Sequence, residues 1–196
     1  MNDFSVIYNY VIEKLERDLP DYVKYHSVEH TKMVLHNVLL ISQNENIKSE
    51  DVFILKVAAL FHDIGFIIKK ENHEESSCEI ASDSLKKFGF KNEHINQVRG
   101  LIMATKIPQK PNSYLGAILA DADLMYLGTD DFTFWSEKLY EEILFHQPTL
   151  SRIEWNEIQY KFISKHKFHT EFCKIHYKNK KLQNLKKLLE FNLSSN

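Results

Sequence analysis

The sequence predicts an all-α protein, a single-domain helical bundle of eight or nine helices. Only 5 Gly and 4 Pro occur among its 196 residues. Average usage is roughly 7% and 5%, so this composition argues against a β-sandwich or barrel with many turns. Each apolar segment is bounded by helix-capping residues rather than by hairpin turns. No change in composition marks a linker, so we expect one domain over residues 1–196.

The first three helices are predicted from their boundaries. All the predicted helices together span residues 3–19, 27–42, 49–65, 72–89, 92–105, 112–128, 130–146, 151–165 and 170–189. Pro20 ends the first, because proline does not continue a helix. Ser27 is a typical N-cap for the second. Ser49 opens the third, whose first turn is acidic as the helix dipole favours, and Gly65 ends it.

The next three helices follow from similar signals. Asn72 and Glu75 have the spacing of a capping box at the start of the fourth helix. Asn92 is a candidate cap for the fifth, and the prolines that follow this helix prevent its continuation. Asn112 or Ser113 begins the sixth, which contains the segment YLGAILADADLMYLG.

The last three helices complete the predicted bundle. Ser151 and Glu154 have capping-box spacing at the start of the eighth helix. The final helix is rich in lysine, and the tail at residues 192–196 is expected to fray. We expect the helices of residues 130–190 to pack on the core formed by the earlier part of the chain.

Charge and cysteine usage exclude several classes of protein. The formal net charge is −2, so no basic field would recruit a nucleic-acid duplex or an anionic membrane. Cys78 and Cys173 lie far apart without a metal-binding or disulfide pattern, which indicates free thiols in a reducing compartment. We find neither a signal peptide nor an apolar run of roughly 18 residues. The sequence therefore predicts a cytoplasmic protein without a membrane span.

The segment AALFHDIGF, residues 58–66, places two ionisable side chains in an apolar helix. His62 and Asp63 would lie about 100° apart on that helix, close enough for both to aim at one point beside it. Burying them costs several kcal/mol unless a partner satisfies them. Asp121 and Asp123 stand in an equally apolar segment, LADADLMYLG. Each of these segments therefore needs a partner for its polar groups.

A third segment, YHSVEH, adds two imidazoles. His26 and His30 are four residues apart and share a helix face only if the turn at Ser27 directs His26 the same way. With the carboxylates, these donors suit Mn²⁺, Fe²⁺, Co²⁺, Ni²⁺, Zn²⁺ or Mg²⁺. Each residue also has a structural interpretation, as a core or surface histidine or as an aspartate paired with a lysine. Separate buried polar groups in three helices would each need a partner, which favours a shared cation.

The three segments in this order resemble the signature of the HD-domain metal-dependent phosphohydrolases. YHSVEHTKMV, AALFHDIGF and LADADLMYLG carry the likeness, which spans about residues 20–130. The resemblance implies a helical core that binds one divalent metal ion through His30, His62, Asp63 and Asp123. Asp123 is preferred to Asp121 because the family's last aspartate precedes a hydrophobic segment like LMYLG. Asp121 is then either close to the ligands or a partner for a neighbouring helix.

Such a site implies hydrolysis of a phosphate ester by a metal-activated water. Asp63 is a candidate to orient that water or to accept its proton. His26 is a candidate general acid, because YHSVEH is similar to the YHN segment of the cyclic-nucleotide phosphodiesterases. Ser27 stands where those enzymes have asparagine. The other interpretation of His26 is a surface histidine that precedes a helix.

The number of metals depends on a departure from the family pattern. HD proteins with two metals, including the oxygenases, carry further histidines, whereas IMATKIPQ has Lys106 at the corresponding position. Lysine is a poor ligand and a good phosphate partner, so we expect one metal, with Lys106 either contacting the substrate phosphate or exposed to solvent. His73 and Glu74 could line the pocket, hold a second, weaker ion, or simply begin a helix. His169 could close the pocket from the C-terminal side.

The predicted function is metal-dependent hydrolysis of a small-molecule phosphate ester. A nucleotide or cyclic nucleotide is the expected substrate, because the segments after Asp123 resemble stand-alone HD phosphohydrolases, some of which are associated with nucleotide-cyclase domains. One alternative is a non-catalytic nucleotide-binding sensor, which would need no metal-bound water. The other is a di-iron oxygenase of the same architecture, which Lys106 disfavours. The basic segment at residues 178–187 is either a solvated helix face or a contact for an anionic partner, and a homodimer is compatible with the sequence.

Overall fold

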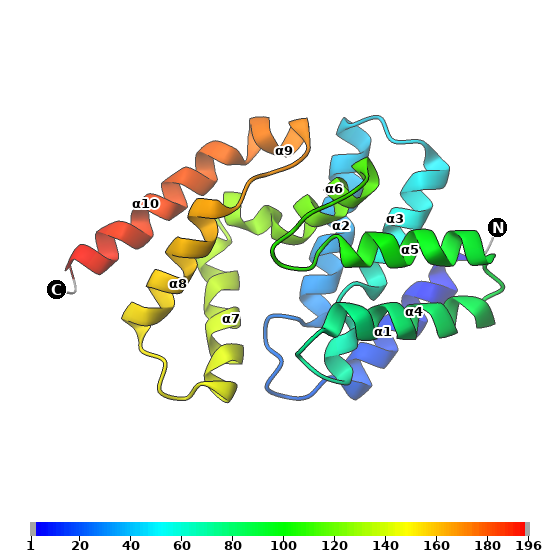
Figure 1. Ribbon diagram of the computed structural model, residues 1–196, viewed down its shortest axis with the longest axis horizontal. Coiled ribbons are helices and arrows are strands. Elements are labelled where there is room, and N and C mark those ends of the chain that lie inside the picture. Colours follow the sequence, from blue (N-terminus) through cyan, green and yellow to red (C-terminus); the bar gives the residue numbers. More distant parts are fainter. Residues whose placement is uncertain (1–2, 195–196) are drawn as a thin grey trace.

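The computed structural model describes residues 3–194, with side chains described up to residue 190, and this part of the chain is entirely helical (Figure 1). Its ten α-helices are α1 (Phe4–Asp18), α2 (Val28–Asn44), α3 (Ser49–Phe61), α4 (His73–Lys87), α5 (Asn92–Met103), α6 (Tyr114–Leu124), α7 (Phe132–His146), α8 (Arg152–Lys165), α9 (Glu171–His176) and α10 (Lys178–Ser194). Two 3₁₀ helices follow α3 and α6, namely η1 (Ile64–Ile67) and η2 (Met125–Gly128). The predicted all-helical fold is confirmed. Within residues 3–194 no helix combines the length and the apolar character that crossing a membrane requires.

Several helix starts confirm the predicted caps. The side chain of Ser27 accepts a hydrogen bond from the backbone N–H of His30 at the start of α2. Ser113 caps α6 in the same way. Ser151 and Glu154 form both hydrogen bonds of a capping box at α8. These side chains satisfy backbone N–H groups that a helix start leaves unpaired.

Asn72 precedes α4 as predicted, but the capping box expected there does not form, and the cap predicted for α5 is wrong. Asn72 adopts a left-handed backbone conformation with φ 54°, and its side chain makes no bond to the helix start. An N-cap is normally extended, because only then does its side chain reach the first turn. The Lys106 ammonium instead donates to the Asn72 side chain at 3.3 Å and also to Glu75. Lys91 precedes α5 without a side-chain cap, so Asn92 is the first residue of that helix.

The third helix ends earlier than predicted. α3 stops at Phe61, and His62 and Asp63 form the turn before η1. These two side chains therefore project from a helix end and not from the side of a continuous helix. Gly65 follows in η1, where a Cβ atom would collide with the backbone of His73. A side chain at this position would push α4 away from the turn.

The last predicted helix is divided in two. α9 and α10 are separated at Tyr177. Here the chain passes so close to Gly128 that a Cβ atom added to Gly128 would collide with the backbone of Tyr177. This tertiary contact with the end of η2 has no local sequence signal. α10 continues to Ser194, past the predicted end at Leu189. Of the tail expected to fray, residues 195–196 lie outside the described residues.

Two apolar clusters hold the helices together. The larger cluster is formed mainly by α1 to α6 and includes the fully buried Phe61. The smaller one joins η2, α7 and α8 around Tyr25 and Trp135. Figure 1 shows α7, α8 and α10 beside the group formed by α1 to α6. Polar residues that the sequence places far apart meet between these two groups of helices.

Candidate metal centre

Four side chains from three parts of the fold converge on one point. They are His30 in the first turn of α2, His62 and Asp63 in the turn after α3, and Asp123 in the last turn of α6. Each offers one ligand atom, and these atoms all lie within 4.8 Å of one another. Both imidazoles are fully buried, and the two aspartates are 5% and 9% exposed. The structure thus brings together the four residues expected to be ligands.

The hydrogen bonds of His62 leave one of its ring nitrogens ready to bind a cation. Nδ1 donates to the carbonyl oxygen of Ala59 at 2.8 Å, which places the lone pair on Nε2. That Nε2 lies 2.9 Å from Oδ2 of Asp63. Oδ2 is buried and accepts no hydrogen bond among the described residues. Two facing lone pairs at this distance need a proton or a cation between them.

The surrounding carboxylates increase the demand for positive charge. Nε2 of His30 lies 3.1 Å from Oδ1 of Asp123 and 3.3 Å from Oδ2 of Asp63. Burial alone would lower the pKa of His30, but its close contacts with the Asp123 and Asp63 carboxylates outweigh burial and raise the pKa to about 9. For Asp63, burial alone would raise the pKa, but the nearby imidazoles of His62 and His26 hold this pKa well below its usual range. A site that stabilises a proton in this way also attracts a metal cation.

The donor set therefore fits a divalent metal ion. Two imidazole nitrogens and two carboxylate oxygens suit ions from Mn²⁺ to Zn²⁺ and also Mg²⁺. Two carboxylates neutralise the charge of such an ion. Four protein donors would leave room for water or a substrate oxygen on an ion that accepts more than four ligands.

A second polar pair lies beside this cluster. Nδ1 of His26 lies 2.6 Å from Oε1 of Glu142, and the other carboxylate oxygen accepts from the backbone N–H groups of Tyr25 and His26 at 2.9 and 3.2 Å. Burial would raise the pKa of Glu142, but these hydrogen bonds lower it. The His26 ring also stacks on Phe66, with 3.8 Å between ring centroids. The imidazole is therefore held from two sides, with Nε2 left for the cavity.

Glu142 is a residue that the sequence analysis missed. It lies 116 residues after His26, on α7, and is only 1% exposed. One signal could have identified it: Glu142 continues the inward-facing stripe of α7 that contains Trp135 and Leu139, where a carboxylate is unexpected. The sequence alone does not tell which distant residue such a buried carboxylate contacts.

His73 and Glu74 lie on the other side of Asp63. Nε2 of His73 is 3.4 Å from Oδ1 of Asp63 and 3.6 Å from Oε1 of Glu74. Burial would lower the pKa of His73, but Asp63 raises it. Asp63 therefore directs one oxygen to the four-residue cluster and the other to His73. Both residues at the start of α4 line the same cavity as His26.

Lys106, Asp121 and His169 lie away from this cluster. Lys106 contacts Glu75 and is not among the residues that line the cavity. The carboxylate of Asp121 is fully buried and accepts from the backbone N–H of His169 and from both the N–H and the hydroxyl of Thr170. Asp121 thus fixes the chain before α9, as a partner of a neighbouring helix. The side chain of His169 lines a separate depression.

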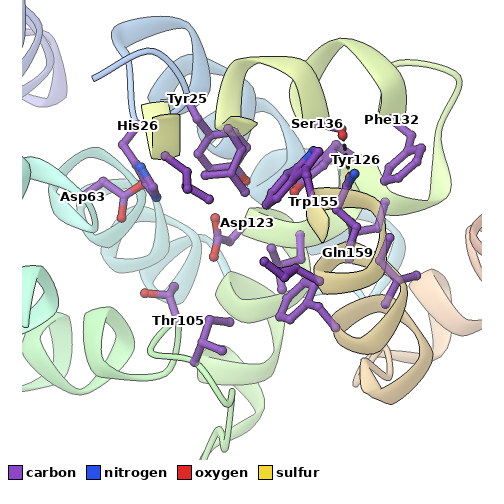
Figure 2. A pocket seen from close by; sticks show the side chains of 18 of the residues that line it. Tyr25, His26, Asp63, Thr105, Asp123, Tyr126, Phe132, Ser136, Trp155 and Gln159 are labelled. Atoms are coloured by element: carbon purple, nitrogen blue, oxygen red, sulfur yellow. Dashed lines mark hydrogen bonds between the residues drawn. The ribbon is translucent and has the colours of Figure 1, made fainter. Parts of the chain in front are cut away.

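The cluster opens into a cavity of about 310 Å³ between the two groups of helices. Several parts of the fold line the cavity: the segment before α2, the α3–η1 turn, the start of α4, the segment after α5, the end of α6, η2, α7 and α8. Figure 2 shows His26, Asp63 and Asp123 at one end of the cavity and Trp155 and Phe132 toward the other. A bound molecule would therefore meet polar groups at one end and helices α7 and α8 at the other.

Comparison with known proteins assigns this fold to a family. The HD domain model matches residues 27–125, about half of the chain, and the chain belongs to the HD domain family. The fold is also similar to the crystal structure of a predicted HD superfamily hydrolase from an uncultured Thermotogales bacterium. The TM-score is 0.62, with 23% identity over 98% of this chain and 93% of that chain. The comparison with curated proteins finds no relative.

These comparisons cover different parts of the chain. The family match contains the four clustered residues and ends before α7, so Glu142 lies outside it. The similarity to the Thermotogales structure includes the C-terminal helices and, at 23% identity, concerns the fold alone. The resemblance to HD domains inferred from three sequence segments is confirmed.

Proposed function

We propose that this protein is a metal-dependent hydrolase of phosphate esters. The observation that supports this best is the set of four ligand atoms within 4.8 Å of one another at the end of a cavity. His30, His62, Asp63 and Asp123 would hold one divalent cation. Membership of the HD domain family and the description of the Thermotogales protein as a predicted hydrolase agree with this proposal.

Asp63 is suited to activate the attacking water. When bound, a divalent cation supplies a Lewis acid and lowers the pKa of a water molecule toward neutrality. Asp63 is ionised, and its Oδ1 points away from the cluster toward His73 at 3.4 Å. In the proposed reaction the water oxygen bonds to phosphorus while Asp63 accepts the proton of the water. The bond from phosphorus to the ester oxygen then breaks.

His26 is suited to protonate the leaving group. The ester oxygen departs as an alcohol only if it receives a proton, and an imidazole supplies one near neutral pH. Glu142 accepts the hydrogen bond of Nδ1 at 2.6 Å, so that Nε2 is the nitrogen available to the substrate. The proton moves from Nε2 to the ester oxygen. Glu142 acts as a positioning residue, because it touches His26 and not the substrate.

Two parts of the sequence-based prediction remain predictions. A nucleotide or cyclic nucleotide as substrate depends on the sequence resemblance alone. A contact between Lys106 and the substrate phosphate requires this side chain to leave Glu75 and Asn72. The mechanism proposed for Asp63 and His26 needs neither.

A metal-supplemented activity screen tests the proposal. Phosphate monoesters, diesters and nucleotides would be incubated with the purified protein and each of the candidate divalent ions. We expect turnover with about one metal per chain by elemental analysis. His62→Ala and Asp63→Ala should reduce turnover to background while circular dichroism shows retained helices. His36→Ala is a matched control, because His36 is exposed on α2.

Three outcomes would contradict the proposal. Turnover by His62→Ala and Asp63→Ala equal to that of the wild type would reject the role of this pair. Full metal occupancy without hydrolysis of any ester would favour a nucleotide sensor. Two irons per chain together with oxygen consumption would favour an oxygenase.

A further inference from the structure

The cavity beside the metal centre has one polar end and one apolar end. Asp63, Asp123 and His26 line the polar end. The far wall, contributed by η2, α7 and α8, is apolar and includes Leu127, Phe132, Leu139, Ile143, Trp155 and Ile163. A substrate whose phosphate lies at the metal centre would therefore direct its organic part against this wall.

The charge of the lining disfavours additional phosphates. Among the described residues that line the cavity none is lysine or arginine, whereas Asp63, Glu74 and Asp123 contribute three carboxylates. One divalent cation balances two of these carboxylates. A nucleoside triphosphate would bring several further negative charges into the cavity without a matching partner, which is costly in a partly desolvated site.

The side chains of Ser136 and Gln159 in the far wall are already paired with each other, whereas the buried indole N–H of Trp155 has no partner among the described residues. The Ser136 hydroxyl donates to Oε1 of Gln159 at 2.5 Å. The Gln159 amide nitrogen lies 3.4 Å from Oδ1 of the buried Asn156. Figure 2 shows Ser136 and Gln159 joined in this way. Of these groups, Trp155 alone would offer a free hydrogen-bond donor to a nucleobase that lost its hydrogen bonds to water, whereas a hydrocarbon or simple aromatic group would need no partner.

We infer that the substrate is a phosphate monoester whose organic part is apolar and uncharged, such as an aryl or alkyl group. This inference is based on the proposed function, since it assigns the phosphate to the metal centre. The expected substrate is then a simple phosphate ester and not the nucleotide predicted from the sequence. Selectivity should come from apolar contact, which improves kcat/KM by about fourfold for each buried methylene, equivalent to about 0.8 kcal/mol.

A neighbouring depression provides the main competing explanation. Lys161, Lys165 and Lys167 line it, and it shares Ile107, Leu124 and Phe162 with the cavity. A substrate with a second anionic group could cross this shared edge and contact the lysines. Such a substrate would be a bisphosphate or a nucleoside diphosphate, and both belong in the test.

The first experiment compares esters with the metal-loaded protein. The series contains ethyl, butyl and hexyl phosphate and 1-naphthyl phosphate, beside glycerol phosphate, 1,6-hexanediol bisphosphate, AMP, ADP and ATP. We expect kcat/KM to rise at least about tenfold from ethyl to hexyl phosphate, and AMP, ADP and ATP to lie below hexyl phosphate. Equal rates across the alkyl series would overturn the inference. So would a preference for ADP, ATP or the bisphosphate.

A substitution in the far wall adds a structural control. Leu139→Gln should lower the ratio of kcat/KM for hexyl phosphate to that for ethyl phosphate by about tenfold, because a polar amide replaces apolar contact in the cavity wall. Ile175→Gln on α9 is the matched control, since Ile175 is 67% exposed and outside the cavity. The control should keep the wild-type ratio. An unchanged ratio in Leu139→Gln would contradict the inference.

Binding of the uncharged product separates this inference from the proposed function. Calorimetric titration with 1-naphthol requires no hydrolysis, and burial of the ring should give a negative heat-capacity change. We expect binding to the wild type and about tenfold weaker binding to Leu139→Gln. Naphthol binding without turnover of any ester would support the apolar site and reject the hydrolase. Turnover without naphthol binding would overturn the inference about the substrate and leave the hydrolase supported.

Discussion

At the scale of single residues, the candidate metal ligands were predictable from the sequence, but Glu142, the hydrogen-bond partner of His26, was not. His62 and Asp123 each stand out in the sequence as a polar residue in an apolar segment, whereas His30 has polar neighbours and was identified by its place in the family pattern. The contact between His26 and Glu142 joins residues 116 positions apart. A pattern along one helix cannot specify such a partner, because the packing of α7 against the segment before α2 decides it.

The role of Glu142 can be tested by changing its charge and not its size. Glu142→Gln should lower kcat by about 10 to 100-fold for esters with poorly acidic leaving groups, because the His26 imidazole is then held less firmly in place. The decrease in kcat should be much smaller for 4-nitrophenyl phosphate, since its leaving group departs without a proton. The measurement is kcat across a series of aryl and alkyl phosphates.

The neighbouring residue provides the control for this series. Glu141→Gln removes the same charge one position earlier, where the side chain is exposed, and should leave all the rates within about twofold. If Glu142→Gln slows every ester by the same factor, whatever its leaving group, then Glu142 supports the fold and does not position a general acid.

At the scale of helices, local signals predicted the starts better than the ends. Ser27, Ser113 and Ser151 cap their helices through their own first turns, so that adjacent sequence contains the information. Asn72 fails as a cap because its left-handed backbone and its contact with Lys106 depend on tertiary structure. The break at Tyr177 depends on the close passage by Gly128.

Asp121 shows how a buried carboxylate holds two elements together. It lies on α6 and accepts hydrogen bonds from the backbone N–H groups of His169 and Thr170 and from the Thr170 hydroxyl, just before α9. Asp121→Ala would leave buried N–H groups without a partner, so we expect a loss of about 3 kcal/mol in the free energy of unfolding. Urea unfolding followed by circular dichroism measures this value.

An exposed aspartate provides the comparison. Asp130→Ala removes an ion pair with Lys180, but the Asp130 side chain is 91% exposed, so we expect a much smaller loss in the free energy of unfolding than for Asp121→Ala. Equal losses in the two variants would mean that solvent replaces the partners of Asp121 and that the start of α9 is held by other contacts.

At the scale of the whole molecule, the sequence predicted an all-helical fold but not how its two groups of helices enclose the cavity. The apolar faces of α7 and α8 were expected to pack, and HD membership explains α2 to α6. That the later helices supply both an apolar wall and Glu142 depends on their orientation relative to the metal centre. Hydrophobic periodicity identifies a buried face but not the group it faces.

The two groups of helices should respond to a metal as one unit. The candidate ligands belong to α2, the α3–η1 turn and α6, which meet only in the folded chain, so a cation that binds them stabilises the fold. At a free concentration about 100 times the dissociation constant, the gain is about 2.7 kcal/mol, or roughly 5 to 10 °C in Tm for a chain of this size. Thermal unfolding would be measured in chelator and after addition of Mn²⁺ or Zn²⁺, and His62→Ala should remove the shift, whereas the exposed His94→Ala should keep it.

Comparing two spectroscopic probes shows whether the two groups of helices unfold together. Both tryptophans, Trp135 on α7 and Trp155 on α8, lie in the group of helices that contributes none of the four ligands. Because Glu142 connects α7 to the segment before α2, we expect tryptophan fluorescence and circular dichroism to report the same metal-induced shift in Tm. A shift seen by circular dichroism alone would show that α7 and α8 unfold separately. In that case the cavity wall would be free to move away from the metal centre, and the bond between His26 and Glu142 would not link the two groups of helices.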